Sequence, residues 1–174
     1  MNNKSFVIVS AALFILIIAS SVFAIDSELT RRTTSGLSGV NVMVEEIQPN
    51  IQKYAQKVGL TSEQVQRDIE SRLKTAGIKV YSWNDWLKAP GKPSLYVNVN
   101  THEYEKYWYA YDVNLELKQM VSLEINPSAK TLASTWSLNM TGIANIGTLD
   151  SIRTNIMRLT DRFIDVYKAA NQKK

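Results

Sequence analysis

Alternation of apolar and polar residues runs through the middle of the chain and predicts β-strands. The longest run extends from Tyr107 to Leu123. Its odd positions are aromatic or aliphatic as far as Leu117, whereas its even positions after Trp108 are mostly polar. One buried face and one solvated face are typical of an antiparallel strand. Similar patterns and β-branched residues predict five strands in all, at residues 40–47, 78–82, 94–103, 107–123 and 131–143.

A helix is predicted at residues 61–76, where every local pattern agrees. Thr61 and Gln64 have the spacing of a capping box, in which each side chain bonds the other residue's backbone. Apolar residues spaced four apart follow and form one stripe, and Gly77 is placed to end the helix in the left-handed conformation. The stripe consists of Val65, Ile69 and Leu73.

A second helix is predicted at residues 149–171, because apolar residues recur there every three or four positions. The element order is then β-α-β-β-β-β-α. We expect an α+β fold in which two helices cover one face of a mostly antiparallel sheet of about five strands. The residues expected to be most buried between the two layers are Ile69, Leu73, Ile156, Leu159 and Phe163.

Residues 1–24 have the three-part pattern of a secretory signal peptide. A short polar start with Lys4 precedes an apolar run, and small residues end at Ala24. We expect cleavage after Ala24 and a periplasmic or secreted protein. The alternative is an uncleaved anchor in the inner membrane, because residues 6–24 approach the length of a spanning helix. Polar residues 25–39 predict a flexible lead-in, and residues 40–174 predict a single domain.

Composition narrows the classes of function. The chain has no Cys, which excludes thiol catalysis, disulfides and thiolate metal sites. Its net charge of +4 is too small to indicate nucleic-acid binding, and predicted export argues against it as well. With the N-terminal segment removed, stable membrane insertion is not expected.

No catalytic, metal-binding or cofactor-binding set can be assembled from the sequence. His102 is the only histidine and lies outside any metal-ligand spacing. The seven glycines stand apart, so no phosphate-binding loop is present, and no G-x-S-x-G motif occurs. We therefore expect neither a catalytic site nor a cofactor.

The stretch HEYEKYWYAYD, residues 102–112, holds the remaining candidates. Tyr107, Tyr109 and Tyr111 continue the apolar face of their strand, so burial under the helices is the simpler interpretation. Trp108 falls on the polar face instead. An exposed Trp among polar residues has the composition of an interface anchor, although it could also cover a neighbouring segment of its own domain. The candidate partner contacts are Trp108, Tyr104 and His102.

The element order over residues 40–171 is similar to that of small α+β domains in bacterial envelope proteins, such as the N-terminal domain of the Tol-Pal propeller protein. The likeness lies in element order and implies a docking module. We therefore expect a non-enzymatic domain that binds another envelope component, with an envelope protein as the partner and the oligomeric state left open. Two alternatives are a small-ligand carrier with a pocket between sheet and helices and, less favoured, a hydrolase centred on His102.

Overall fold

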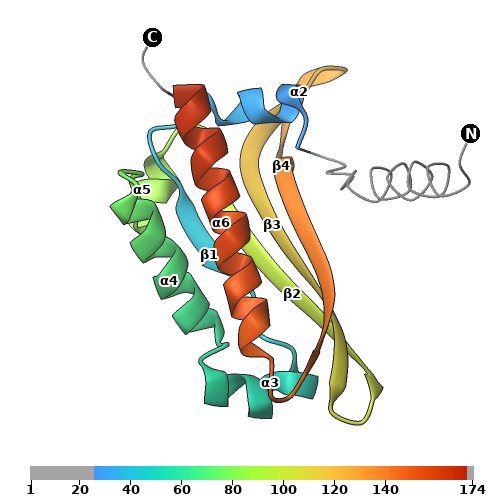
Figure 1. The fold of residues 1–174 in the computed structure, drawn as a ribbon. Helices are drawn as coiled ribbons and strands as arrows, with labels where there is room; N and C mark the ends of the chain where they lie inside the picture. The colour runs from blue at the N-terminus through green and yellow to red at the C-terminus, as the bar shows by residue number, and fades with distance from the viewer. Residues whose placement is uncertain (1–25, 172–174) are drawn as a thin grey trace, which may run out of the picture.

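A four-stranded sheet in the order β1-β2-β3-β4 lies at the centre of the computed structural model, which describes residues 26–171 (Figure 1). Strands β2, β3 and β4 pair antiparallel, whereas β1 runs parallel to β2. The fold class is α+β as predicted, but the sheet is mixed and has one strand fewer than expected. Its strands are β1 (Asn41–Val44), β2 (Ser94–Glu105), β3 (Trp108–Leu123) and β4 (Asn126–Asn145).

The segment at residues 78–82 is not a strand, contrary to the prediction. It forms one isolated bridge, in which Val80 pairs with Val40. The extended conformation ends there because Ser82 caps the next helix by accepting a hydrogen bond from the backbone N–H of Asp85. The chain between β1 and β2 is therefore helical. A long crossover of this kind lets two strands pair in parallel.

Two long helices cover one face of the sheet, as the apolar periodicity predicts (Figure 1). They are α4 (Ser62–Thr75) and α6 (Asp150–Asn171). Between the helices and the sheet lies one hydrophobic core. The five residues predicted to be most buried are at most 4% exposed, which confirms the assignment of both helix faces. They are Ile69, Leu73, Ile156, Leu159 and Phe163.

Half of the predicted capping box of α4 is present. The hydroxyl of Thr61 accepts a hydrogen bond from the backbone N–H of Gln64. The Gln64 side chain donates to Asp68 at 2.8 Å instead of reaching back to the cap. Asp68 is held in turn by Arg153 of α6 at 2.6 Å. A tertiary ion pair therefore redirects a side chain that the local motif would use.

Shorter helices connect the main elements. None of the helices between residues 26 and 171 is both long and apolar enough to span a membrane. One of the shorter helices begins at Pro49 and another begins at Trp83, after the cap at Ser82. The short helices are α2 (Glu28–Arg31), η1 (Arg32–Thr34), α3 (Pro49–Ala55), η2 (Gln56–Val58) and α5 (Trp83–Lys88).

Residues 26–39, for which the composition predicts a flexible lead-in, contain α2 and η1 and pack on the domain. Thr34 is fully buried. The backbone carbonyl of Thr34 accepts a hydrogen bond from Asn171 at the end of α6. Asp26 accepts one from the Trp136 indole on β4. The segment thus bridges α6 and β4, while the predicted signal peptide at 1–24 lies outside the described residues.

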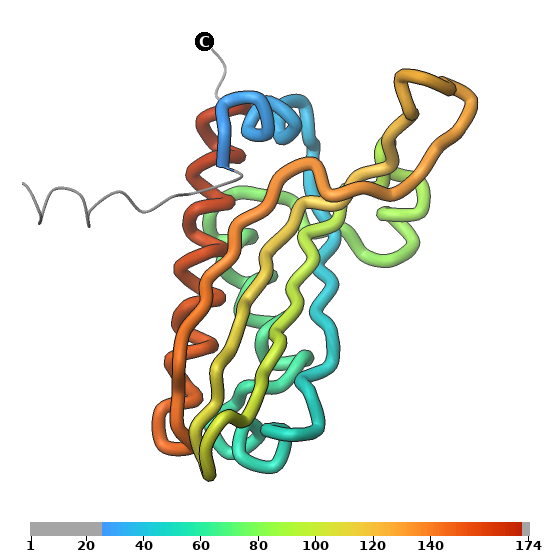
Figure 2. Tube along the Cα trace, turned by 90° about the vertical axis from the view of Figure 1, so that its right-hand side faces the viewer, coloured from blue at the N-terminus to red at the C-terminus, as the bar shows by residue number. Residues whose placement is uncertain are grey.

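The β3–β4 hairpin continues past the rest of the sheet as a two-stranded ribbon (Figure 2). Its turn lies at residues 124–125, and Ile125 is 96% exposed. The pairing register shifts beside Leu117. Leu132 is four residues from the buried Trp136, so uninterrupted alternation would place both on one side, but the shift leaves Leu132 exposed.

Candidate functional site

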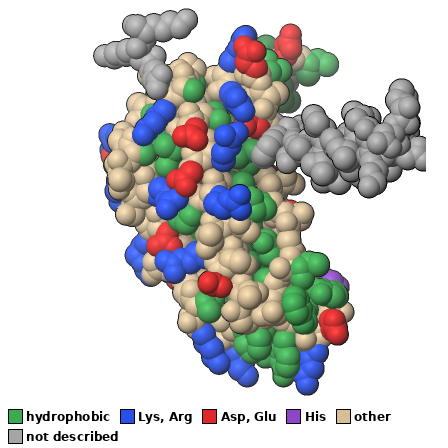
Figure 3. All heavy atoms as spheres, in the orientation of Figure 1, with side chains coloured by type: hydrophobic (Ala, Val, Ile, Leu, Met, Phe, Trp, Pro, Cys, Tyr) green, Lys and Arg blue, Asp and Glu red, His purple; other side chains and the backbone are tan. Residues whose placement is uncertain are grey.

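Large apolar side chains gather at the end of the domain where the β2–β3 hairpin meets α3 (Figure 3). We call this surface the aromatic tip. Four of its side chains come from the sheet and its hairpin turn and are between 41% and 61% exposed, while the fifth is partly buried on α3. The members of the aromatic tip are Tyr54, Tyr104, Tyr107, Trp108 and Ile143.

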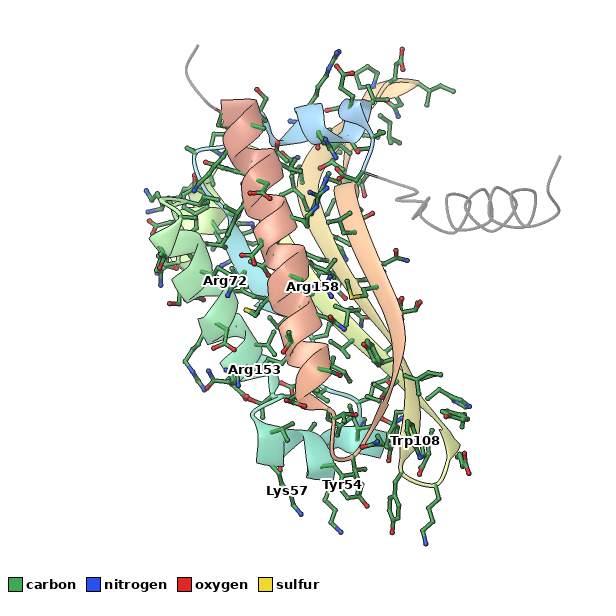
Figure 4. The ribbon with its side chains drawn as sticks, in the orientation of Figure 1. Tyr54, Lys57, Arg72, Trp108, Arg153 and Arg158 are labelled. Carbon is green, nitrogen blue, oxygen red and sulfur yellow. The ribbon has the colours of Figure 1, made fainter. Side chains whose placement is uncertain are left out.

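The three contact residues predicted from the sequence all lie on this hairpin. Trp108 is 41% exposed and stands opposite Asn145 of β4, so that Ile143 is its diagonal neighbour on the open face. Diagonal neighbours on a sheet are within reach of aromatic side chains. Tyr104 is 53% exposed at a register shift, and His102 is exposed opposite Ala110. Figure 4 shows Trp108 at the same end of the molecule as Tyr54.

Tyr107 was not identified as a surface residue by the alternation, which places it on the buried face with Tyr109 and Tyr111. Those two residues are buried, but Tyr107 is 42% exposed. The strands end at Glu105 and Trp108, so Tyr107 belongs to the turn and leaves the face pattern. Its backbone φ is positive and lies in the left-handed region, which is uncommon for a bulky residue.

Besides the hydrogen bond that its carbonyl accepts from the Ile146 N–H, two contacts hold Tyr107 in this conformation. Its backbone N–H donates to the Glu103 carboxylate at 3.1 Å. Its ring meets Tyr54 of α3 edge to face, with 6.2 Å between the ring centroids. Sequence spacing cannot reveal the second contact because Tyr54 and Tyr107 lie far apart in the chain. A left-handed tyrosine held by its surroundings is the kind of strain that collects at functional sites.

Charged residues surround the aromatic tip. Lys106 lies over the Tyr107 ring, with its Nζ 5.1 Å from the ring centroid, and Lys53 lies 5.9 Å from the Tyr54 centroid. Glu103 and Glu105 on β2 are exposed on the same hairpin. An apolar centre with a polar, solvated rim is the usual arrangement of a protein–protein interface.

The open face of the sheet beside the tip is polar and already hydrogen-bonded. Both Tyr96 and Asn98 donate to the Glu45 carboxylate. Burial, and then the hydrogen bond to Glu45, raise the pKa of Tyr96 to about 12, so this phenol remains a donor at neutral pH. Lys118 lies over the Tyr96 ring at 3.4 Å from its centroid. These polar groups already pair with one another. The aromatic residues of the tip, in contrast, remain exposed to water, so the tip is the better candidate for a contact surface.

A groove also runs between α4 and α6 on the outer side of the helices. Two ion pairs cross it. Arg153 bonds Asp68 at 2.6 Å, and Arg72 bonds Asp161 at the same distance. These two ion pairs join α4 to α6 across the groove, and Lys168 also lines it.

His102 stands apart from other potential metal ligands in the described chain. The side chain is exposed and makes no hydrogen bond with the residues from 26 to 171. Over the same residues, histidine and the carboxylates form no group of three that could hold a metal ion. Nucleophilic catalysis needs a base oriented by a second group, and no residue of that part of the chain is hydrogen-bonded to the His102 ring.

The fold and the aromatic tip define the molecule as a small α+β domain with one helix-covered and one open sheet face. The exposed aromatic tip is the feature of this domain that we treat as its candidate binding site. Neither the protein-family models nor the curated proteins compared with the chain include one that matches it.

Proposed function

We propose that this protein is a non-enzymatic docking module of the bacterial cell envelope and that the aromatic tip contacts its partner. The envelope location rests on the signal-peptide pattern of residues 1–24 and is compatible with a domain that needs no disulfides. The partner in this proposal is another envelope protein. Its surface would offer a pocket for Trp108 and polar groups for the rim.

The observation that carries the proposal is the exposure of four large apolar side chains at one end of the domain. An aromatic side chain buries about 150–250 Å² when it is covered, so leaving several in water forgoes a large stabilisation. Trp and Tyr are also the residues that most often dominate binding energy at protein interfaces. Strain at Tyr107 points the same way, because that strain keeps an aromatic ring on the surface.

Neither alternative function has a comparable observation in its favour. A ligand carrier would need a cavity between sheet and helices, where Leu115, Ile156 and Phe163 are fully buried in one core. The Phe163 ring also packs on Trp136 with 5.4 Å between centroids. A hydrolase would need an oriented base, and His102 lies exposed on the hairpin. The docking proposal gives a reason for the exposed aromatic side chains of the tip, and neither alternative does.

Replacing Trp108 with Ala tests the proposal directly. Because Trp108 lies on the open face and outside the core, we expect the free energy of unfolding to change by less than about 1 kcal/mol. We expect partner binding to weaken at least tenfold, which corresponds to about 1.4 kcal/mol. Copurification from the periplasm with identification by mass spectrometry supplies the partner, and titration of the purified pair measures the affinity.

The matched control is Trp83→Ala. Trp83 is also exposed, at 58%, but it lies on α5, far from the aromatic tip. Binding should be the same as for the unmodified protein in this variant. If Trp108→Ala lowers the melting temperature by several degrees while the captured partners stay the same, Trp108 is structural and the docking proposal fails.

A further inference from the structure

Strand β4 is the terminal strand of the sheet, and its outer edge pairs with no other strand of residues 26–171 (Figure 2). The edge is covered at one end, where Thr33 donates a hydrogen bond to the Thr135 carbonyl and Asp26 binds the Trp136 indole. Over residues 137–142 the backbone bonds only β3 among the described residues. We call residues 137–142 the β4 edge. Within the described part of the chain, the backbone donors and acceptors on the outer side of this edge have no partner.

The β4 edge lacks the usual protection against strand pairing. Natural sheets protect exposed edges with charged residues, proline or bulges. No charged residue occurs between residues 131 and 149, and Pro127 is the nearest proline. The register is regular from Trp136 to Asn145. A long, regular and uncharged edge is the template used when an extended peptide adds a strand to a sheet.

The helix beside this edge supplies positive charge. Figure 4 places Arg158 on the side of α6 that faces β4, whereas Arg153 and Arg72 point toward the groove with α4. Arg158 is exposed, and its only hydrogen bond within residues 26–171 is a 3.5 Å contact with Asn155 on its own helix. No carboxylate within the same residues pairs with Arg158, in contrast to Arg153 and Arg72. The neighbouring Arg162, also on this helix, adds a second cation whose partner is Asp26 at 3.5 Å.

We propose that the β4 edge binds an extended acidic peptide, which adds to the sheet as a fifth strand. Its backbone would pair with residues 137–142, and carboxylates on one side of the peptide would reach Arg158. The neutral edge gives pairing without charge repulsion, and the arginine selects the sign of the partner's charge. A second copy of this chain is a poorer occupant, because twofold pairing through β4 would bring Arg158 of both copies to the same interface.

The probe is a synthetic ten-residue peptide of alternating valine and glutamate, titrated into isotope-labelled protein and followed by NMR. We expect it to bind and to slow amide exchange at alternate residues of the β4 edge. The same peptide with lysine in place of glutamate should bind at least tenfold more weakly. The acidic peptide with alternate backbone nitrogens methylated keeps its charge but loses donors, and it should also bind at least tenfold more weakly.

The matching variants are Arg158→Glu and Arg158→Gln, with Arg67→Glu as the control. Arg67 is exposed on α4, so its reversal changes the net charge equally without approaching β4. We expect more than tenfold weaker binding for Arg158→Glu, a smaller loss for Arg158→Gln and little change for the control. Equal binding of the methylated peptide, or an unprotected β4 edge, would overturn the proposal. So would a concentration-dependent dimer that protects the same amides, because the occupant would then be a second copy.

This inference does not depend on the aromatic tip. The Trp108→Ala variant should keep its affinity for the acidic peptide, and Arg158→Glu should keep its affinity for the partner of the tip. Each proposal can therefore fail while the other stands.

Discussion

Tyr107 combines an unfavourable backbone conformation with an exposed aromatic ring. A left-handed residue with a side chain costs about 1–2 kcal/mol relative to the right-handed form. The hydrogen bond to Glu103 and the edge contact with Tyr54 offset part of that cost. A residue chosen for stability alone would be Gly or Asn at this position, which supports our proposal that the ring contacts a partner.

Tyr107→Asn separates these contributions. Asn tolerates the left-handed conformation, so the variant relieves strain while losing an aromatic contact worth about 0.5–1.5 kcal/mol. We expect the free energy of unfolding in urea to change by no more than about 1 kcal/mol and partner binding to weaken several-fold. Destabilisation well beyond that value, with unchanged binding, would mean that the ring serves the fold.

Asp26 is the residue that links the N-terminal segment to the sheet. Arg31 donates two hydrogen bonds of 2.6 Å to its carboxylate, and the Trp136 indole donates a third at 3.2 Å. These bonds hold the pKa of Asp26 below the ordinary value of 3.8, with Arg31 as the largest cause. The stabilisation is therefore complete above the unfolded-state pKa and is lost as the pH falls through the folded-state pKa.

Asp26→Asn should lower the free energy of unfolding by about 1–3 kcal/mol at pH 7, because charge-assisted hydrogen bonds are lost. The unmodified protein should lose stability as the pH falls below about 4, and the variant should lose less over the same range. Urea unfolding from pH 7 to pH 3 measures both effects. Glu28→Gln, which removes an exposed partner of Arg32, is the control and should have almost no effect. An equally steep acid profile for Asp26→Asn would exclude this carboxylate as the group responsible.

At the scale of elements, apolar periodicity predicted α4, α6 and the two faces of β3. The predictions hold because each element buries one stripe or one face against a single core. The pattern fails where an element ends or a register shifts. Tyr107 leaves the buried face at a turn, and Leu132 leaves it beyond the register shift at Leu117. The two-residue alternation of a strand does not continue across a turn or a register shift.

Leu159→Ala tests the packing of α6 on the sheet. Leu159 is 4% exposed in the core. Truncation should leave a cavity and lower the free energy of unfolding in urea by about 2–5 kcal/mol. Leu29→Ala is the control, because Leu29 on α2 is 75% exposed. The control should change stability by less than about 0.5 kcal/mol. If Leu159→Ala behaves like the control, this helix face is not core.

At the scale of the whole molecule, the ends of the described chain are close together and fixed. Asn171 at the end of α6 binds the Thr34 carbonyl, and its Oδ1 accepts from the backbone N–H of Gly36 at 2.8 Å. The N-terminal segment is therefore packed beside the end of α6. Its first described residue, Asp26, lies two positions after the predicted cleavage site at Ala24. The aromatic tip lies at the opposite end of the domain (Figure 1).

At the scale of the whole molecule, the testable prediction concerns export and the N-terminus of the mature protein. We expect the mature protein to begin at Ile25 and to occur outside the cytoplasm, because small residues precede that position as a signal peptidase requires. N-terminal sequencing of protein purified from its native host decides the point. Retention of Met1 would establish the anchored alternative.

The sequence by itself determined the main elements and their buried faces, because helix and strand periodicities are local consequences of covalent geometry. It also predicted that Trp108 lies outside the core, since one strand's alternation suffices for that. Only the tertiary structure decided that β1 is parallel to β2, that Asp26 binds β4, and that Tyr54 meets Tyr107. These features depend on contacts between residues far apart in the chain, which the energy of the whole packed domain selects and no local pattern encodes.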